Sequence, residues 1–71
     1  MSLSVLLHKL RSPLTAIGGF TESLALQSQR GTLTDERLID RLGRIRVAAE
    51  RIDQLLDDLE ATLAHEHTAS G

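Results

Sequence analysis

The sequence has no cysteine, tyrosine or tryptophan, one proline (Pro13) and one aromatic residue (Phe20). Without cysteine the chain forms neither a disulfide nor a thiolate metal site, which fits a reducing compartment. A nucleic-acid-binding surface usually needs excess positive charge or aromatic side chains that stack on bases. The formal net charge here is -2. We therefore expect no nucleic-acid partner.

Long apolar runs are also missing. The run from Leu3 to Leu7 is interrupted by Ser4 and is far too short to span a bilayer. It also lacks the basic start and the small-residue cleavage site of a signal peptide.

The spacing of the histidines gives only a weak indication of a metal site. His65 and His67 stand two positions apart, with no third ligand at a standard zinc spacing. We predict no metal site and interpret residues 65–71 as a frayed tail.

A chain of 71 residues has a marginal core on its own and usually needs an additional stabilising element. With disulfides and metals excluded, oligomerisation is the expected one.

Two long stretches have helical periodicity. The first, at about 4–29, has apolar positions spaced alternately four and three apart, as in a heptad seam: Leu3, Leu7, Leu10, Leu14, Ile17 and Leu24, with Thr21 in the missing place. The second, at about 34–64, continues the rhythm with Leu38, Leu42, Ile45, Ala49, Ile52, Leu56, Leu59 and Leu63, widened by Ala48 and Leu55. No strand pattern is present.

The two stretches are separated by a predicted turn at 30–33. Gly31 suits the left-handed residue that ends a helix, and Thr34 is favoured over Thr32 as the cap of the second helix. A short turn makes the helices antiparallel neighbours. Paired this way, Leu24 meets Leu38 near the turn and Leu7 meets Leu56 at the open end. The predicted fold is an all-α, antiparallel two-helix hairpin that homodimerises into a four-helix bundle.

Charges on the second helix are uneven. Arginines fill its first half and acids its second, and local pairs Asp40–Arg44 and Arg46–Glu50 support the helix. One interpretation of these charges is a solvated face. Alternatively, Lys9 pairs with Asp57 or Asp58, or the acidic half belongs to a docking surface.

The stretch "HKLRSPLTAI", residues 8–17, departs from ordinary helix. Positions three, four and seven after His8 share its face and are the polar Arg11, Ser12 and Thr15, so His8 is expected to point to water. Pro13 leaves the carbonyl of Lys9 without its helical partner and is expected to bend the helix.

These ten residues resemble the H-box of sensor histidine kinases: His, an acid, Leu, Arg, a small polar residue, Pro, Leu, Thr, any residue, Ile. The family's dimerisation and histidine-phosphotransfer domain is a hairpin that dimerises into a four-helix bundle. The resemblance implies that His8 is the phosphoacceptor and that Pro13 lets the first helix bend. It also implies that Ser12 orients water for phosphatase action.

The resemblance also implies partners. A separate ATP-binding catalytic domain, with ATP and Mg, would phosphorylate His8, and a response regulator receiver domain would take the phosphoryl group onto an aspartate. The domain would be cytoplasmic, in a full-length protein that is soluble or membrane-anchored. These 71 residues contain no Gly-rich phosphate loop, so we expect no cofactor within them and no autophosphorylation by them alone.

Lys9 departs from the family pattern, because it stands where the family has Glu or Asp. An ammonium group accepts neither a proton nor a hydrogen bond, although it can attract phosphate. Three interpretations stay open. The site is active with another base, such as an acid of the second helix; it is slow; or it is degenerate and the domain is a dimeric scaffold.

Overall fold

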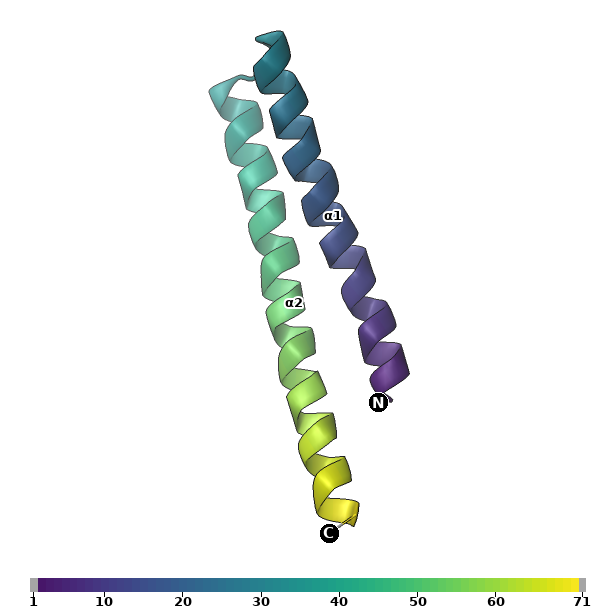
Figure 1. The fold of residues 1–71 in the computed structure, drawn as a ribbon. Helices are drawn as coiled ribbons and strands as arrows, with labels where there is room; N and C mark the ends of the chain where they lie inside the picture. The colour runs from purple at the N-terminus through teal and green to yellow at the C-terminus, as the bar shows by residue number, and fades with distance from the viewer. Residues whose placement is uncertain (1, 71) are drawn as a thin grey trace.

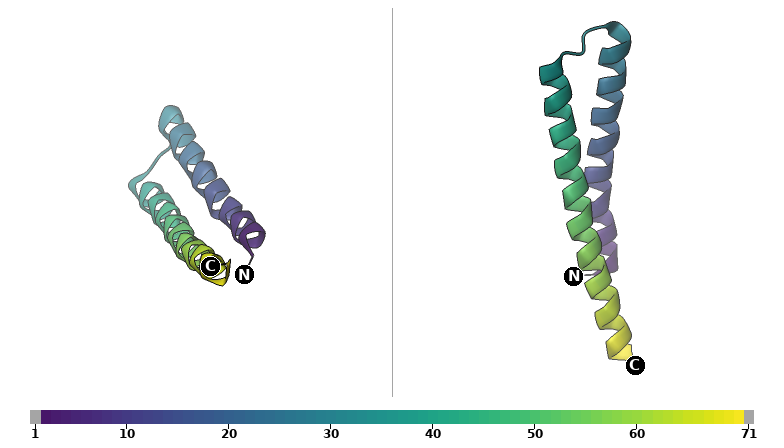
Figure 2. Two further views of the ribbon diagram at one scale, coloured as in Figure 1. Left: turned by 60° about the horizontal axis from the view of Figure 1, so that its bottom comes forward. Right: turned by 90° about the vertical axis from the view of Figure 1, so that its left-hand side faces the viewer.

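The computed structural model describes the backbone of residues 2–70 and the side chains of residues 2–65. Two antiparallel helices, α1 (Leu3–Arg30) and α2 (Asp35–Ser70), lie side by side and are joined by a short turn (Figures 1 and 2). The hairpin is a rod of 58 × 16 × 13 Å. The predicted all-α, antiparallel two-helix hairpin is confirmed.

The turn uses the residues expected from the sequence. Gly31 ends α1 in the left-handed conformation, with φ 70° and ψ 21°. The Thr32 N–H donates to the Gln27 carbonyl oxygen at 2.9 Å, which satisfies a carbonyl of the last turn of α1. The Thr34 hydroxyl oxygen accepts from the Arg37 N–H at 3.2 Å, so Thr34 is the N-cap of α2.

The helix boundaries differ from the expected ones mainly at the end of α2. Helix α1 extends one residue beyond each predicted limit of 4–29, and the Ser2 hydroxyl caps it by accepting from the Val5 N–H at 3.2 Å. Helix α2 passes the predicted end at residue 64 and continues to Ser70. No proline or glycine interrupts the chain between Leu63 and Gly71, so no residue stops the helix there. The backbone of 65–70 is therefore helical, whereas the sequence assigned it to a tail; Gly71 and the side chains of 66–70 lie outside the described residues.

The two helices meet along one row of side chains each. The members of both rows are buried or half-buried and alternate three and four positions apart: Leu3, Leu6, Leu10, Pro13, Ile17, Phe20 and Leu24 in α1, and Leu38, Arg41, Ile45, Ala48, Ile52, Leu55 and Leu59 in α2. Leu6 is 0 % exposed and Leu55 is 2 % exposed. We call these two rows the hairpin seam.

The predicted seam is therefore correct only in part. Its members Leu10 and Ile17 do lie in the hairpin seam, but Leu7 and Leu14 are 58 % and 57 % exposed. Leu6 takes the place of Leu7 in the contact between the helices. Apolar residues spaced four and three apart define an apolar stripe along a helix. This stripe is so wide that either of two neighbouring rows within it fits the contact with the other helix.

The remaining half of the predicted stripe forms a second row along one side of the hairpin. Helical periodicity of 100° per residue places its members on the same side of both helices: Leu7, Leu14 and Thr21 in α1, and Leu42, Ala49, Leu56 and Leu63 in α2. Its α2 leucines Leu42, Leu56 and Leu63 are 50 %, 42 % and 48 % exposed. Thr21 turns its hydroxyl back to the Ile17 carbonyl oxygen at 2.7 Å, which leaves its methyl group to this surface. We call it the outer apolar row.

A second copy of the chain would bury the outer apolar row, as a four-helix bundle requires. We expect the chain to sediment as a dimer and Leu56→Lys to shift it towards monomer, because a charge would then be buried in the interface. The matched control is Ile39→Lys, since Ile39 is 70 % exposed and lies outside this row. A wild-type chain that sediments as a folded monomer would contradict the bundle.

Two glycines should respond oppositely to alanine. Gly31 has a positive φ, so Gly31→Ala should lower the free energy of unfolding by about 1 kcal/mol. Gly19 lies inside α1 with open space around it, so Gly19→Ala should raise that free energy by about 1 kcal/mol. Urea denaturation followed by circular dichroism measures both; equal effects of the same sign would refute this account of the turn.

Candidate functional site

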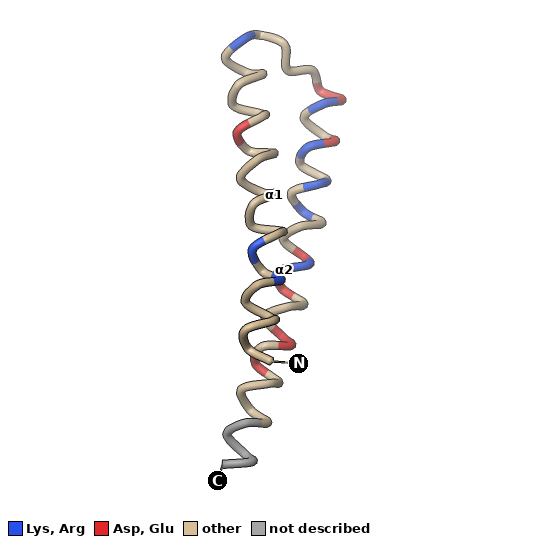
Figure 3. Tube along the Cα trace, turned by 90° about the vertical axis from the view of Figure 1, so that its right-hand side faces the viewer, with Lys and Arg blue, Asp and Glu red and all other residues tan. Residues whose placement is uncertain are grey.

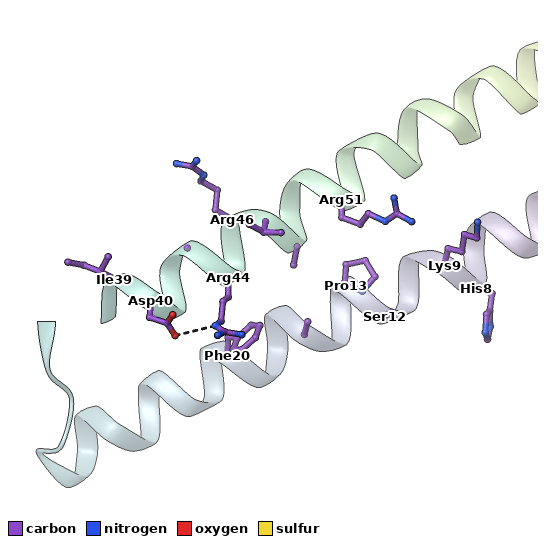
Figure 4. Close-up of a pocket in the computed structure, with 14 residues that line it drawn as sticks. His8, Lys9, Ser12, Pro13, Phe20, Ile39, Asp40, Arg44, Arg46 and Arg51 are labelled. Carbon is purple, nitrogen blue, oxygen red and sulfur yellow. Dashed lines mark hydrogen bonds and ion pairs between the residues drawn. The ribbon is translucent and has the colours of Figure 1, made fainter. Parts of the chain in front are cut away.

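His8 lies in the second turn of α1 and points away from α2 (Figure 4). The hairpin seam on either side of it, at Leu6 and Leu10, fixes this direction, because a position between two seam residues of a helix faces outward. Its side chain is exposed, as the sequence predicted. Among the described residues, none hydrogen-bonds to or forms an ion pair with its imidazole. The ring is therefore open to an incoming partner.

Ser12 follows His8 by one helical turn and is also exposed. Positions four apart share a face of a helix, so the structure places the Ser12 hydroxyl on the His8 side of α1, as predicted. Among the described residues, the hydroxyl neither caps a helix nor forms a hydrogen bond across to α2. It is available to a molecule that approaches His8.

Pro13 has an internal position in the fold. It is buried in the hairpin seam, at the same level as the small, buried Ala48 of α2. Helix α1 continues through it without a break (Figure 1). Because proline has no N–H, the carbonyl of Lys9 has no donor in the helical pattern, which leaves a weak point one residue after His8. The bend predicted at this weak point stays a prediction.

His8, Ser12 and Pro13 border an open groove of about 1200 Å³ between the two helices. The rest of its lining comes from Lys9, Ala16 and Phe20 in α1, and from Ile39, Asp40, Gly43, Arg44, Arg46, Val47, Ala48 and Arg51 in α2. Helical periodicity places the α1 lining on the side of the hairpin away from the outer apolar row. A dimer formed through that row would leave the groove accessible.

At the end of the groove far from His8, Arg44 is held between an acid and an aromatic ring (Figure 4). Its Nε donates to Asp40 Oδ2 at 3.2 Å, and its guanidinium carbon lies 5.9 Å from the centre of the Phe20 ring. Arg46 Nε lies 3.3 Å from Glu50 Oε1. Both predicted ion pairs of α2 are thus present, and each exposed pair of this kind contributes about 0.3–0.5 kcal/mol.

Lys9 does not form the ion pair that the sequence suggested. No ion pair joins it to Asp57 or Asp58 among the described residues. The seam register explains this, because Lys9 is level with Asp53, and Asp57 stands a full turn further along α2. Lys9 instead extends along the groove on the same side as Arg51 (Figure 4).

The groove is strongly basic. Four cationic side chains line it, Lys9, Arg44, Arg46 and Arg51, against the single acid Asp40. The charged residues of α2 beyond Arg51 are acids (Figure 3), and none of them lines the groove. Apart from Asp40, at the far end from His8, the groove therefore offers no acid of α2.

The sequence reasoning missed Arg51 as a member of this site. The signal was present, because Asp40, Arg44, Val47 and Arg51 follow each other at four, three and four positions and so share one face of α2. Whether this face borders His8 depends on which row of the apolar stripe forms the hairpin seam. The periodicity of the sequence fitted two such rows.

The described side chains include no group of three or more His, Cys, Asp or Glu residues able to hold a metal ion. Within the same part of the chain, neither helix has a stretch apolar and long enough to cross a membrane.

Comparison with known families gives one match. The model of the family described as "His Kinase A (phospho-acceptor) domain" matches residues 2–66, which is nearly the entire hairpin. No curated protein and no solved structure gives a significant match to the chain.

Proposed function

This chain belongs to the family of His Kinase A phospho-acceptor domains, and on that premise we propose that His8 is the phosphoacceptor of a two-component sensor histidine kinase. The observation that carries the proposal is the exposed imidazole of His8 at the head of the matching H-box, one residue before a backbone weakened by Pro13. The family implies a phospho-acceptor and dimerisation role within a histidine kinase.

The proposed reaction has two transfers. A ring nitrogen of His8 bonds to the γ-phosphorus of ATP held by a separate catalytic domain, the bond to the bridging oxygen breaks, ADP leaves, and the imidazole loses a proton to water. A carboxylate oxygen of a response regulator then bonds to the phosphorus, the phosphorus–nitrogen bond breaks, and the imidazole nitrogen takes back a proton from water. Imidazole suits this work because it is a nucleophile near neutral pH.

The hairpin contributes position and access rather than covalent chemistry, which is the usual demand of phosphoryl transfer. The exposure of His8 lets two different partners reach the same nitrogen. We propose that Pro13 lets α1 bend when the catalytic domain approaches and that Ser12 orients water when the phosphoryl group is hydrolysed. ATP and Mg would be held by the catalytic domain, since this chain offers no phosphate loop.

The second candidate function is a dimeric scaffold that transmits a signal without being phosphorylated. The observation in its favour is Lys9, whose ammonium group cannot accept the proton of the imidazole, together with the lack of any α2 acid from the second half of the helix in the groove. The exposed outer apolar row supports dimerisation under either proposal.

The first proposal is tested by labelling. Mixed with the ATP-binding domain of its own kinase, Mg and ATP, the chain should acquire acid-labile phosphate, and His8→Ala should remove the label. His65→Ala is the matched control, because His65 is also an exposed helical histidine. Label that survives in His8→Ala would refute the assignment of His8.

Restoring a carboxylate separates the two candidate functions. If the scaffold proposal holds, the wild type takes no label and Lys9→Glu should bring labelling from background to a clear signal, because a base then stands beside His8. If the wild-type site is active, the wild type is labelled, and Lys9→Glu changes the rate of a labelling that is already present. The measurement is the initial rate of phosphate incorporation, with Lys9→Gln to separate loss of the cation from gain of the acid.

A further inference from the structure

Two cations of the groove have no acidic partner. Lys9 of α1 and Arg51 of α2 both line it near His8, and their side chains lie on the same side of the helices, with Pro13 close by (Figure 4). No ion pair or hydrogen bond from either side chain is present among the described residues. The other two cations of the groove differ, since Arg44 pairs with Asp40 and Arg46 pairs with Glu50.

No acid of the groove is placed to neutralise the pair. Its one acid, Asp40, precedes Arg51 by eleven positions, which is about 16 Å along a helix that rises 1.5 Å per residue. Asp40 also already binds Arg41 and Arg44. Two like charges from different helices therefore create a local positive potential, which attracts an anion of matching size.

We propose that Lys9 and Arg51 form an anion-binding subsite that takes a phosphate group and so concentrates phosphate-bearing donors beside His8. This inference rests on the proposed role of His8 as the acceptor. Arginine and lysine are the side chains that most often bind phosphate oxygens. His8 borders the same groove and directly precedes Lys9, so an anion at the pair lies next to the reacting imidazole.

The subsite gives Lys9 a part in the reaction that differs from proton acceptance. It raises the local concentration of the donor and offsets the negative charge that a donor brings, while the imidazole remains the nucleophile. Such attraction between exposed charges weakens as salt is added, so the contribution of the pair should fall with ionic strength.

Binding is tested with inorganic phosphate as the probe, followed by NMR on the full 71-residue chain against sodium chloride at equal ionic strength. The signals of Lys9 and Arg51 should shift saturably with phosphate. Lys9→Gln and Arg51→Gln should each weaken binding about fivefold, the loss of one unit charge a few ångströms away in water. Arg46→Gln is the matched control, a groove arginine that already has a partner in Glu50, and it should bind like the wild type.

Equal phosphate binding by the wild type and by both Gln variants would overturn the subsite, as would equal shifts with chloride. Circular dichroism of each variant checks that the helices are intact, which is expected because Lys9, Arg46 and Arg51 are all exposed.

Recruitment is tested with phosphoramidate, a small donor that needs no catalytic domain. The ring nitrogen of His8 bonds to its phosphorus, the phosphorus–nitrogen bond of the donor breaks, and ammonia leaves with the proton that the imidazole gives up. Lys9→Gln and Arg51→Gln should slow His8 labelling about fivefold at low salt, and added salt should remove the difference. Equal labelling rates at low salt would overturn recruitment.

The phosphoacceptor role of His8 and the anion-binding subsite can be refuted independently of each other. Phosphate binding at Lys9 and Arg51 without any label on His8 from ATP and the catalytic domain supports the subsite and refutes the phosphoacceptor role. Label on His8 from ATP with no effect of Lys9→Gln or Arg51→Gln on phosphate binding supports the role and refutes the subsite.

Discussion

The packing of α1 against α2 along the hairpin seam is the constraint from which the other features follow. Leu6 and Leu55 are almost fully buried there. Once these rows face each other, the 100° turn per residue fixes every other direction. Leu7 and Leu14 fall on one side, Lys9 falls on the other, and His8 points outward.

The hairpin thus has three faces with different roles. The seam holds the two helices together, the outer apolar row offers a surface for a second copy, and the remaining side carries the groove beside His8. An exposed imidazole on a face that neither the seam nor the outer apolar row uses can be approached by a partner without disturbing either. Pro13 has two effects in this arrangement. Its ring is buried in the seam, and its missing N–H leaves the Lys9 carbonyl free.

Local features were predictable because they depend on neighbouring residues only. Gly31 ends a helix and Thr34 begins one for reasons of backbone conformation and capping, and the structure has both. The same is true of the pair Asp40–Arg44, four residues apart on one helix. Cross-helix features were not predictable in this way. The Lys9 pairing failed because Asp57 stands a full helical turn beyond the level of Lys9.

The sequence by itself determined the helices, the turn between them, the family motif and the exposed polar face on which His8 lies, since each is encoded within a few turns of helix. Only the tertiary structure decided which half of the broad apolar stripe joins the helices and which half stays exposed. It also decided that Arg51 lines the same groove as Lys9, whereas the acids that follow Arg51 do not line it. The physical reason is that periodicity gives the direction of a side chain relative to its own helix, whereas what it meets depends on how the second helix is rotated and shifted against the first.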